Sequence, residues 1–208
     1  DALYTLRNLE YLSIDQPIQL DLLQFSNLKT LYFTGDNKLK NIGALINLRD
    51  LLMTSTTHQD LTHLENLRNL ETLRICGGRI TSLKGIEAFR NLERLDLLYC
   101  RKLIDVDSIS KLANLKKLHI EKCVQLANFS FLQGNQTIRN LFVEKTANLG
   151  FISSMSNLEK FSFWNCIDGN LEPLIHVPCR IYFYPNKRHY SHTLEQINKM
   201  RITNGLTS

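Results

Sequence analysis

The segment NLERLDLLYCRKL at residues 91–103 sets three leucines, Leu92, Leu95 and Leu97, ahead of a cysteine, Cys100. A single residue separates the two later leucines. This is the period of a β-strand, so both leucines point to one face and Asp96 points to the other. Cys100 is then either a reactive thiol or one more member of an apolar core. The choice depends on whether the same pattern recurs in the chain.

The pattern recurs along almost the whole sequence. Eight copies and a weaker ninth follow one another, with 19 to 23 residues between equivalent positions. The copies are NLEYLSI (8–14), NLKTLYF (27–33), NLRDLLM (47–53), NLETLRI (69–75), NLERLDL (91–97), NLKKLHI (114–120), TIRNLFV (137–143), NLEKFSF (157–163) and VPCRIYF (177–183). Such self-similarity indicates stacked equivalent units, because one unit cannot bury its own apolar face.

These copies resemble the leucine-rich repeat family, whose motif is L-x-x-L-x-L-x-x-N/C-x-L in units of roughly 20–29 residues. The resemblance covers residue 3 to about residue 184, and the short units are most similar to the bacterial, internalin-like type. It implies an α/β fold, a right-handed solenoid with a curved parallel β-sheet on the concave side and short helical or 3₁₀ turns on the convex side. We expect about nine repeats over residues 1–184.

The last residues predict a cover for the final repeat. A terminal repeat exposes both its core and an unpaired strand edge, so a C-terminal capping segment with a short helix is expected over residues 185–208. Thr193 and Gln196 have the spacing of a capping box and predict that the helix begins before Leu194, Ile197 and Met200.

Cys100 occupies the N/C position of the motif, eight residues after Leu92. Cys123, Cys166 and Thr146 hold the same position in their own repeats. A small residue with a weak hydrogen-bonding group can point inward there and meet turn backbone groups. The spacing therefore predicts a structural ladder and not a catalytic thiol.

The sequence offers no other catalytic or metal-binding constellation. His189 and His192 form an H-x-x-H pair, but no nearby cysteine or acidic cluster supplies further ligands at zinc spacing. Phosphate-binding glycine loops, nucleophile elbows and H-E-x-x-H motifs are absent from the sequence. We therefore expect no enzymatic activity, no cofactor and no metal.

Composition favours a folded protein in a reducing compartment. The 208 residues carry a net charge of +5 without runs of like charge, and the five cysteines lack close paired spacings. No stretch reaches the roughly 18 apolar residues of a membrane span. The resemblance implies a bacterial, cytoplasmic protein, and we expect a monomer that does not contact a membrane. The sequence opens on Asp1 and not on Met, which leaves room for an upstream segment.

The repeat register also identifies the side chains on the exposed face of the sheet. The residues between the last two apolar positions of each repeat form one column, and the residues two positions later form a second. The first column is Ser13, Tyr32, Leu52, Arg74, Asp96, His119, Phe142, Ser162 and Tyr182, and the second is Asp15, Thr34, Thr54, Cys76, Leu98, Glu121, Glu144, Trp164 and Tyr184.

Four aromatic residues, Phe142, Trp164, Tyr182 and Tyr184, gather on the last repeats and are called the aromatic patch below. Three bases surround them at the position before the central leucine, namely Lys117, Lys160 and Arg180. Aromatic and arginine side chains dominate protein-binding hot spots, so this is the favoured contact surface. The alternative is that these aromatics pack under the cap.

We therefore predict a non-enzymatic recognition module that binds a protein partner along its concave sheet. A central band of mixed charge, formed by Arg74, Arg94, Asp96, His119 and Glu121, suits a polar protein better than a phosphate backbone. Three alternatives stay open. They are a nucleic-acid binder that uses Arg74, Arg94, Lys117, Lys160 and Arg180, a secreted or surface internalin-like adhesin, and an effector enzyme whose catalytic domain lies outside these residues.

Overall fold

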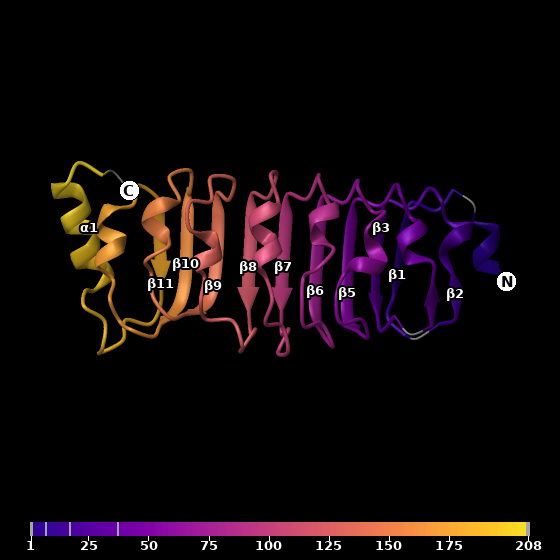
Figure 1. The fold of residues 1–208 in the computed structure, drawn as a ribbon, viewed down its shortest axis with the longest axis horizontal. Helices are drawn as coiled ribbons and strands as arrows, with labels where there is room; N and C mark the ends of the chain where they lie inside the picture. Colours follow the sequence, from indigo (N-terminus) through magenta and orange to yellow (C-terminus); the bar gives the residue numbers. More distant parts are fainter. Residues whose placement is uncertain (1, 7, 17, 37, 207–208) are drawn as a thin grey trace. The chain divides into compact units, whose positions relative to one another are not determined.

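The computed structural model describes residues 2–6, 8–16, 18–36 and 38–206. It divides into two compact units, the first formed by residues 1–115 with 122–125 and the second by residues 116–121 with 126–208. Figure 1 shows both units built from short parallel strands, with 3₁₀ turns connecting them. Each unit is described by itself below.

The strands of each unit follow one another in the order of the repeats. The first unit contains β1 (Tyr11–Ile14), β3 (Thr30–Thr34), β5 (Asp50–Thr56), β6 (Thr72–Gly78) and β7 (Arg94–Leu98), each pairing in parallel with the next. The second contains β8 (Lys117–Glu121), β9 (Asn140–Thr146), β10 (Lys160–Cys166) and β11 (Arg180–Phe183), paired in the same way. Every one of the nine predicted segments therefore contains a strand, and the prediction of a parallel sheet is confirmed.

The core consists of the apolar positions that the repeat pattern turned inward. Leu31, Leu51 and Leu73 lie opposite one another on β3, β5 and β6, and all three are fully buried. In the second unit the inward positions are filled increasingly by phenylalanine, and Phe163 stacks on Phe161 and Phe183. Burial of such side chains, at about 25 cal/mol per Å² of apolar surface, is the main force that holds the repeats together.

The chain returns between strands through short 3₁₀ segments, because 19 to 23 residues per repeat leave no room for a full helix. These segments are η1 (Ala2–Thr5), η2 (Leu22–Gln24), η3 (Ile42–Ala44), η4 (Thr62–Leu64), η5 (Ile86–Ala88), η6 (Asp107–Lys111), η7 (Ser130–Leu132), η8 (Ile152–Ser154) and η9 (Glu172–His176). The first unit also has a small parallel pair, β2 (Leu20–Asp21) with β4 (Leu39–Lys40).

The asparagine that opens most copies has a structural role. In the copies that begin at residues 47, 69, 114 and 157, its side-chain amide donates a hydrogen bond to the backbone carbonyl one residue before the start of the preceding copy. Asn47 donates to Ser26 O at 2.9 Å and Asn69 to Ile46 O at 2.9 Å. Equivalent bonds join Asn114 to Arg90 O (2.7 Å) and, in the second unit, Asn157 to Gln136 O (2.8 Å). This asparagine ladder satisfies turn carbonyls that would otherwise lack partners.

The chain ends in the expected helix, α1 (Leu194–Thr203), and the capping box of Thr193 and Gln196 is present. Ile197 is fully buried, but Met200 is 41% exposed. Arg201, four residues after Ile197, is buried instead and donates a 2.6 Å hydrogen bond to Cys179 O. The helix therefore fixes itself to the last repeat partly through a buried cation, which the apolar pattern did not predict.

Within the described ranges, no helix is long and apolar enough to cross a membrane.

Candidate partner-binding surface

The cysteine ladder lies in the core, as predicted. Cys100 and Cys123 are buried free thiols, and Cys100 Sγ lies 3.5 Å from the carbonyl oxygens of Ile75 and Leu98. The hydrogen bond with Cys123, together with burial, raises the pKa of the Cys100 thiol. In the second unit, burial and the neighbouring Asp168 raise the pKa of Cys166 to about 12. A nucleophilic cysteine needs a lowered pKa and exposure, so these thiols are structural.

The two histidines of the capping segment make hydrogen bonds of their own. His189 Nε2 lies 3.0 Å from Cys166 O, and His192 Nδ1 lies 2.9 Å from Ser191 Oγ. Within the residues that the structure describes, no group of three or more His, Cys, Asp or Glu side chains could hold a metal ion.

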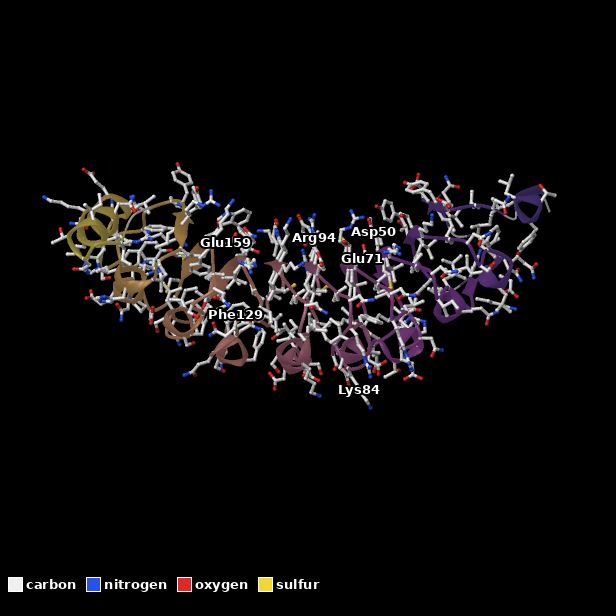
Figure 2. The ribbon with its side chains drawn as sticks, turned by 90° about the horizontal axis from the view of Figure 1, so that it is seen from above. Asp50, Glu71, Lys84, Arg94, Phe129 and Glu159 are labelled. Atoms are coloured by element: carbon white, nitrogen blue, oxygen red, sulfur yellow. The ribbon has the colours of Figure 1, made fainter. Side chains whose placement is uncertain are left out.

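On the first unit, the charged side chains of the sheet face are paired with one another. Arg74 lies within 3.0 and 3.2 Å of both carboxylate oxygens of Asp50, and Tyr32 donates a 2.8 Å hydrogen bond to the same carboxylate. The Arg74 guanidinium also sits 4.6 Å from the centre of the Tyr32 ring. Figure 2 shows Asp50 and Arg94 on this face, with Lys84 on the opposite side of the unit.

Asp96 is less accessible than the repeat pattern predicted. It is only 5% exposed, because Arg94 lies against it and donates hydrogen bonds of 2.8 to 3.1 Å to both of its oxygens. The Asp96 carboxylate is thus bound by Arg94 and is not available to a partner. Asp96 is therefore not part of the candidate binding surface.

On the second unit, the aromatic patch is open. Trp164, Tyr182 and Tyr184 are 42%, 49% and 82% exposed. Phe142 joins them through an edge contact with Trp164, with ring centres 5.3 Å apart, and His119 lies against Phe142 at 4.4 Å. The register of β8 to β11 aligns His119, Phe142, Ser162 and Tyr182. Trp164 joins them through its contact with Phe142, and Tyr184 lines the same pocket as Trp164 and Tyr182.

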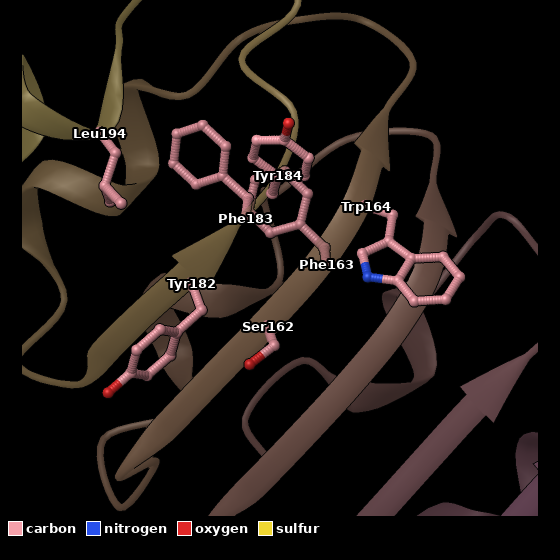
Figure 3. A pocket seen from close by; sticks show the side chains of 7 residues that line it. All are labelled: Ser162, Phe163, Trp164, Tyr182, Phe183, Tyr184 and Leu194. Atoms are coloured by element: carbon pink, nitrogen blue, oxygen red, sulfur yellow. The ribbon is translucent and has the colours of Figure 1, made fainter.

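A shallow pocket of about 240 Å³ lies within this patch. It is lined by Ser162, Phe163, Trp164, Tyr182, Phe183, Tyr184 and Leu194. Figure 3 shows Ser162 between Tyr182 and Trp164, with Leu194 at the start of α1 completing the lining. Ser162 has the smallest side chain in this set, so the pocket exists where a small residue on β10 stands between large ones.

The cap does not cover the aromatic patch. The aromatic residue that the cap inserts into the second unit is Tyr190, whose ring lies 5.8 Å from Phe183. Its hydroxyl accepts a 3.1 Å hydrogen bond from the Cys166 amide. Tyr190 therefore closes the end of the core and leaves Trp164, Tyr182 and Tyr184 exposed, against the alternative that these residues pack under the cap.

Three bases form a row beside the patch, and we call Lys117, Lys160 and Arg180 the basic row. Lys117 and Lys160 both lie opposite Asn140 in the register, and Arg180 lies opposite Lys160. All three are exposed. Lys160 Nζ sits 5.0 Å from the centre of the Tyr182 ring, which connects the row to the patch. Glu121, by contrast, lies 3.1 Å from His119.

The sequence reasoning missed two polar clusters of the first unit. Asp50 was not considered, although it holds both Arg74 and Tyr32. Asp36, eight residues after Leu28, occupies the ladder position of its repeat, and its buried carboxylate accepts hydrogen bonds from Thr56 and Thr57. The same spacing that placed Cys100 would have placed Asp36.

Parallel strands in repeat order, connected by 3₁₀ turns and lined by inward leucines, decide the fold. This is the leucine-rich repeat fold. Among solved structures, the chain is similar to an internalin (inlF) from Listeria monocytogenes, with 13% identity, a TM-score of 0.49, and 82% of this chain and 67% of that chain covered. It is also similar to internalin C2 from the same organism, with 16% identity, a TM-score of 0.46, and 85% and 74% covered.

A third similar structure is the plant peptide hormone receptor RGFR1 in complex with RGF2, with 18% identity and a TM-score of 0.48. The similarity covers 85% of this chain but 30% of the receptor chain. No protein-family model and no curated protein sequence matches the chain.

Proposed function

We propose that this leucine-rich repeat protein is a non-enzymatic recognition module that binds a protein partner through the sheet face of its second unit. The exposure of Trp164, Tyr182 and Tyr184 around one apolar pocket supports this proposal. Large aromatic side chains remove much area from water on binding and lose little conformational freedom, which makes them strong anchors. The strands beneath them hold the anchors in a fixed array.

Nucleic-acid binding is the competing function, and the charge pairing on the first unit weakens it. Two of its five candidate bases, Arg74 and Arg94, are held by Asp50 and Asp96. A phosphate backbone would have to compete with these carboxylates for the two arginines. Proteins that bind along a nucleic-acid backbone present basic side chains that have no acidic partner within the protein. Lys117, Lys160 and Arg180 alone make a short row.

Comparative affinity capture tests the proposal. The wild-type protein and a Trp164→Ala/Tyr182→Ala double variant would be immobilised and exposed to nuclease-treated lysate of the organism that makes the protein. We expect one protein to bind the wild type and to be lost from the variant by more than about tenfold, as for removal of two hot-spot residues. Tyr11→Ala is the matched control, because Tyr11 is 54% exposed on the first unit. Equal recovery from the wild type and the double variant would contradict the proposal.

A further inference from the structure

We propose that the segment recognised by the second unit is an acidic, extended peptide that places one apolar side chain in the pocket between Trp164 and Tyr182. This inference rests on the proposed function and adds the chemistry of the partner. It follows from three features of the second unit, namely its net charge, its unpaired basic row and the size of its pocket.

The second unit carries nearly all of the protein's net charge. It contains 10 lysines and arginines against 6 aspartates and glutamates, which leaves +4 of the chain's +5. The first unit, although longer, is close to neutral. A partner steered by charge would therefore approach the second unit and would itself be acidic.

The positive charge on the sheet face is concentrated in the basic row. In the described part of the chain, Lys117, Lys160 and Arg180 form no ion pair. The two acidic residues that the second unit contributes to the second column, Glu121 and Glu144, both have interactions and are not free. The face thus presents cations without internal counterparts, whereas Arg74 and Arg94 of the first unit are paired with Asp50 and Asp96.

The basic row and the pocket are close enough for one short segment to use both. Lys160 contacts the Tyr182 ring, and Tyr182 lines the pocket. Lys160 and Trp164 are four residues apart on β10, which corresponds to about 13 Å along an extended strand. An extended peptide would therefore carry its carboxylates two to four positions from the apolar side chain.

The pocket suits one side chain and not a cofactor. Its volume of about 240 Å³ is below the roughly 300–1,000 Å³ typical of small-molecule sites. Apart from Ser162, every side chain of the lining is aromatic or aliphatic, so the lining selects an apolar group. Leucine, isoleucine or methionine would fill it between the two aromatic rings.

Trp164 is the only tryptophan in the chain, so its fluorescence reports directly on the pocket. Three short synthetic peptides of equal length and without aromatic residues would be titrated into the full chain. The first has a single leucine flanked by aspartates and glutamates, the second has the same leucine flanked by lysines, and the third replaces the leucine of the acidic peptide with serine. We expect the acidic leucine peptide alone to saturate a blue shift of the Trp164 emission.

Two charge-reversal variants locate the charge. Lys160→Glu is expected to weaken binding of the acidic leucine peptide about tenfold or more, because it replaces an attraction with a repulsion. Lys199→Glu makes the same change at an exposed lysine of α1 and is expected to leave the affinity within about twofold of the wild type. Equal losses in the two variants would show a general charge effect and would overturn the basic row as the site.

The remaining outcomes also decide the question. Equal or tighter binding of the lysine-flanked peptide or the serine peptide overturns the inference. Stronger quenching of Trp164 by a single-stranded oligonucleotide than by any peptide overturns it in favour of nucleic acid. Binding of none of the probes also overturns it, while the proposed function stands or falls separately on the affinity capture with the aromatic double variant.

Discussion

Gly78 is a position where the fold allows no side chain. It occupies the ladder position of its repeat, with a φ of +98°, and a Cβ added there would lie 2.4 Å from Thr56 O and 2.6 Å from Thr56 N. Those atoms belong to the backbone of the neighbouring strand and cannot move aside. No side chain fits at this point, so the otherwise regular ladder of Thr, Cys and Asp is interrupted by glycine.

Gly78→Ala is therefore expected to lower the free energy of unfolding by about 3 kcal/mol or more, measured as the urea midpoint by circular dichroism. Gly77→Ala is the matched control. Gly77 also has a positive φ, of 68°, but its added Cβ would meet only Tyr99 O at 3.8 Å. The control should lose about 1 kcal/mol. Equal losses in the two variants would show that backbone conformation, and not the close approach to Thr56, determines the cost.

His63 makes the stability of the first unit depend on pH. Its ring stacks on His58 with centres 3.6 Å apart, and within the described residues neither of its ring nitrogens has a hydrogen-bond partner. Burial, and then the nearby His58, lower the pKa of His63 from 6.5 to about 4, although Asp36 and Asp60 act in the opposite direction. In the unfolded chain, His63 therefore binds a proton near pH 6.5, whereas in the folded chain it binds this proton only near pH 4.

The contribution of His63 is complete above pH 6.5 and is lost as the pH falls toward 4. We expect the free energy of unfolding to fall by about 1–2 kcal/mol over this range, after allowance for solvent screening of a half-buried group. His63→Phe keeps a ring against His58 but cannot titrate, so its urea midpoint should change less between pH 7 and pH 4.5. The same loss in both proteins would place the titration elsewhere.

The residue scale is also where prediction from sequence ended. The repeat pattern placed Asp96 on the exposed face because it alternates with Leu95 and Leu97. Whether such a residue meets solvent depends on its neighbours, and Arg94 covers it. Asp50 and Arg74 are 24 residues apart in the sequence, and their contact depends on rotamers of side chains on adjacent strands. Periodicity fixes the strand register but not these lateral pairs.

At the scale of elements, the strands and α1 were predictable because each has a local signal. The L-x-L pattern fixes the strands through burial of alternate residues, and the capping box fixes the start of α1. The division into two compact units was not predicted, because the repeats on either side of it have the same sequence pattern. The burial of Arg201 was likewise not predicted, because a charged residue at that position of the helix is expected on its exposed face.

The capping box gives α1 a stability that can be measured apart from the rest of the protein. Thr193 Oγ1 accepts a 3.2 Å hydrogen bond from the Gln196 amide, and Gln196 Oε1 accepts a 2.8 Å bond from the Thr193 amide. Thr193→Ala should weaken the first turn by about 1 kcal/mol, which corresponds to about fivefold faster amide hydrogen exchange there. Thr193→Ser keeps the hydroxyl and should exchange like the wild type. Faster exchange in both variants would contradict the role of the hydroxyl.

At the scale of the whole molecule, the thiols report whether the repeats are stacked as described. Cys100, Cys123, Cys166 and Cys179 are buried, and Cys76 alone is partly exposed. At pH 8 without denaturant, a thiol reagent should modify Cys76 slowly, because burial raises its pKa, and the other four only after unfolding in urea. Mass spectrometry would assign each site. Rapid labelling of Cys100 or Cys166 in the native protein would contradict the ladder.

Charge also differs on this scale, since one unit is nearly neutral and the other is basic. The sequence shows the total of +5 but not its distribution over surfaces, because basic and acidic residues are interspersed along the chain. Folding pairs Arg74 and Arg94 of the first unit with acidic side chains and, among the described residues, leaves the basic row of the second unit without ion pairs. The proposed binding of an acidic peptide therefore depends on which basic side chains form ion pairs within the protein and which do not.

The asparagine ladder has a direction. In each bond the donor belongs to the later repeat and the acceptor to the one before it, as for Asn69 and Ile46 O. During synthesis on the ribosome, every new amide therefore emerges after the carbonyl that will receive it. Loss of leading repeats would leave an amide donor without its acceptor, while loss of trailing repeats would leave only a carbonyl facing water. Growth from the first residue to the last thus matches the order in which the protein can satisfy its own backbone.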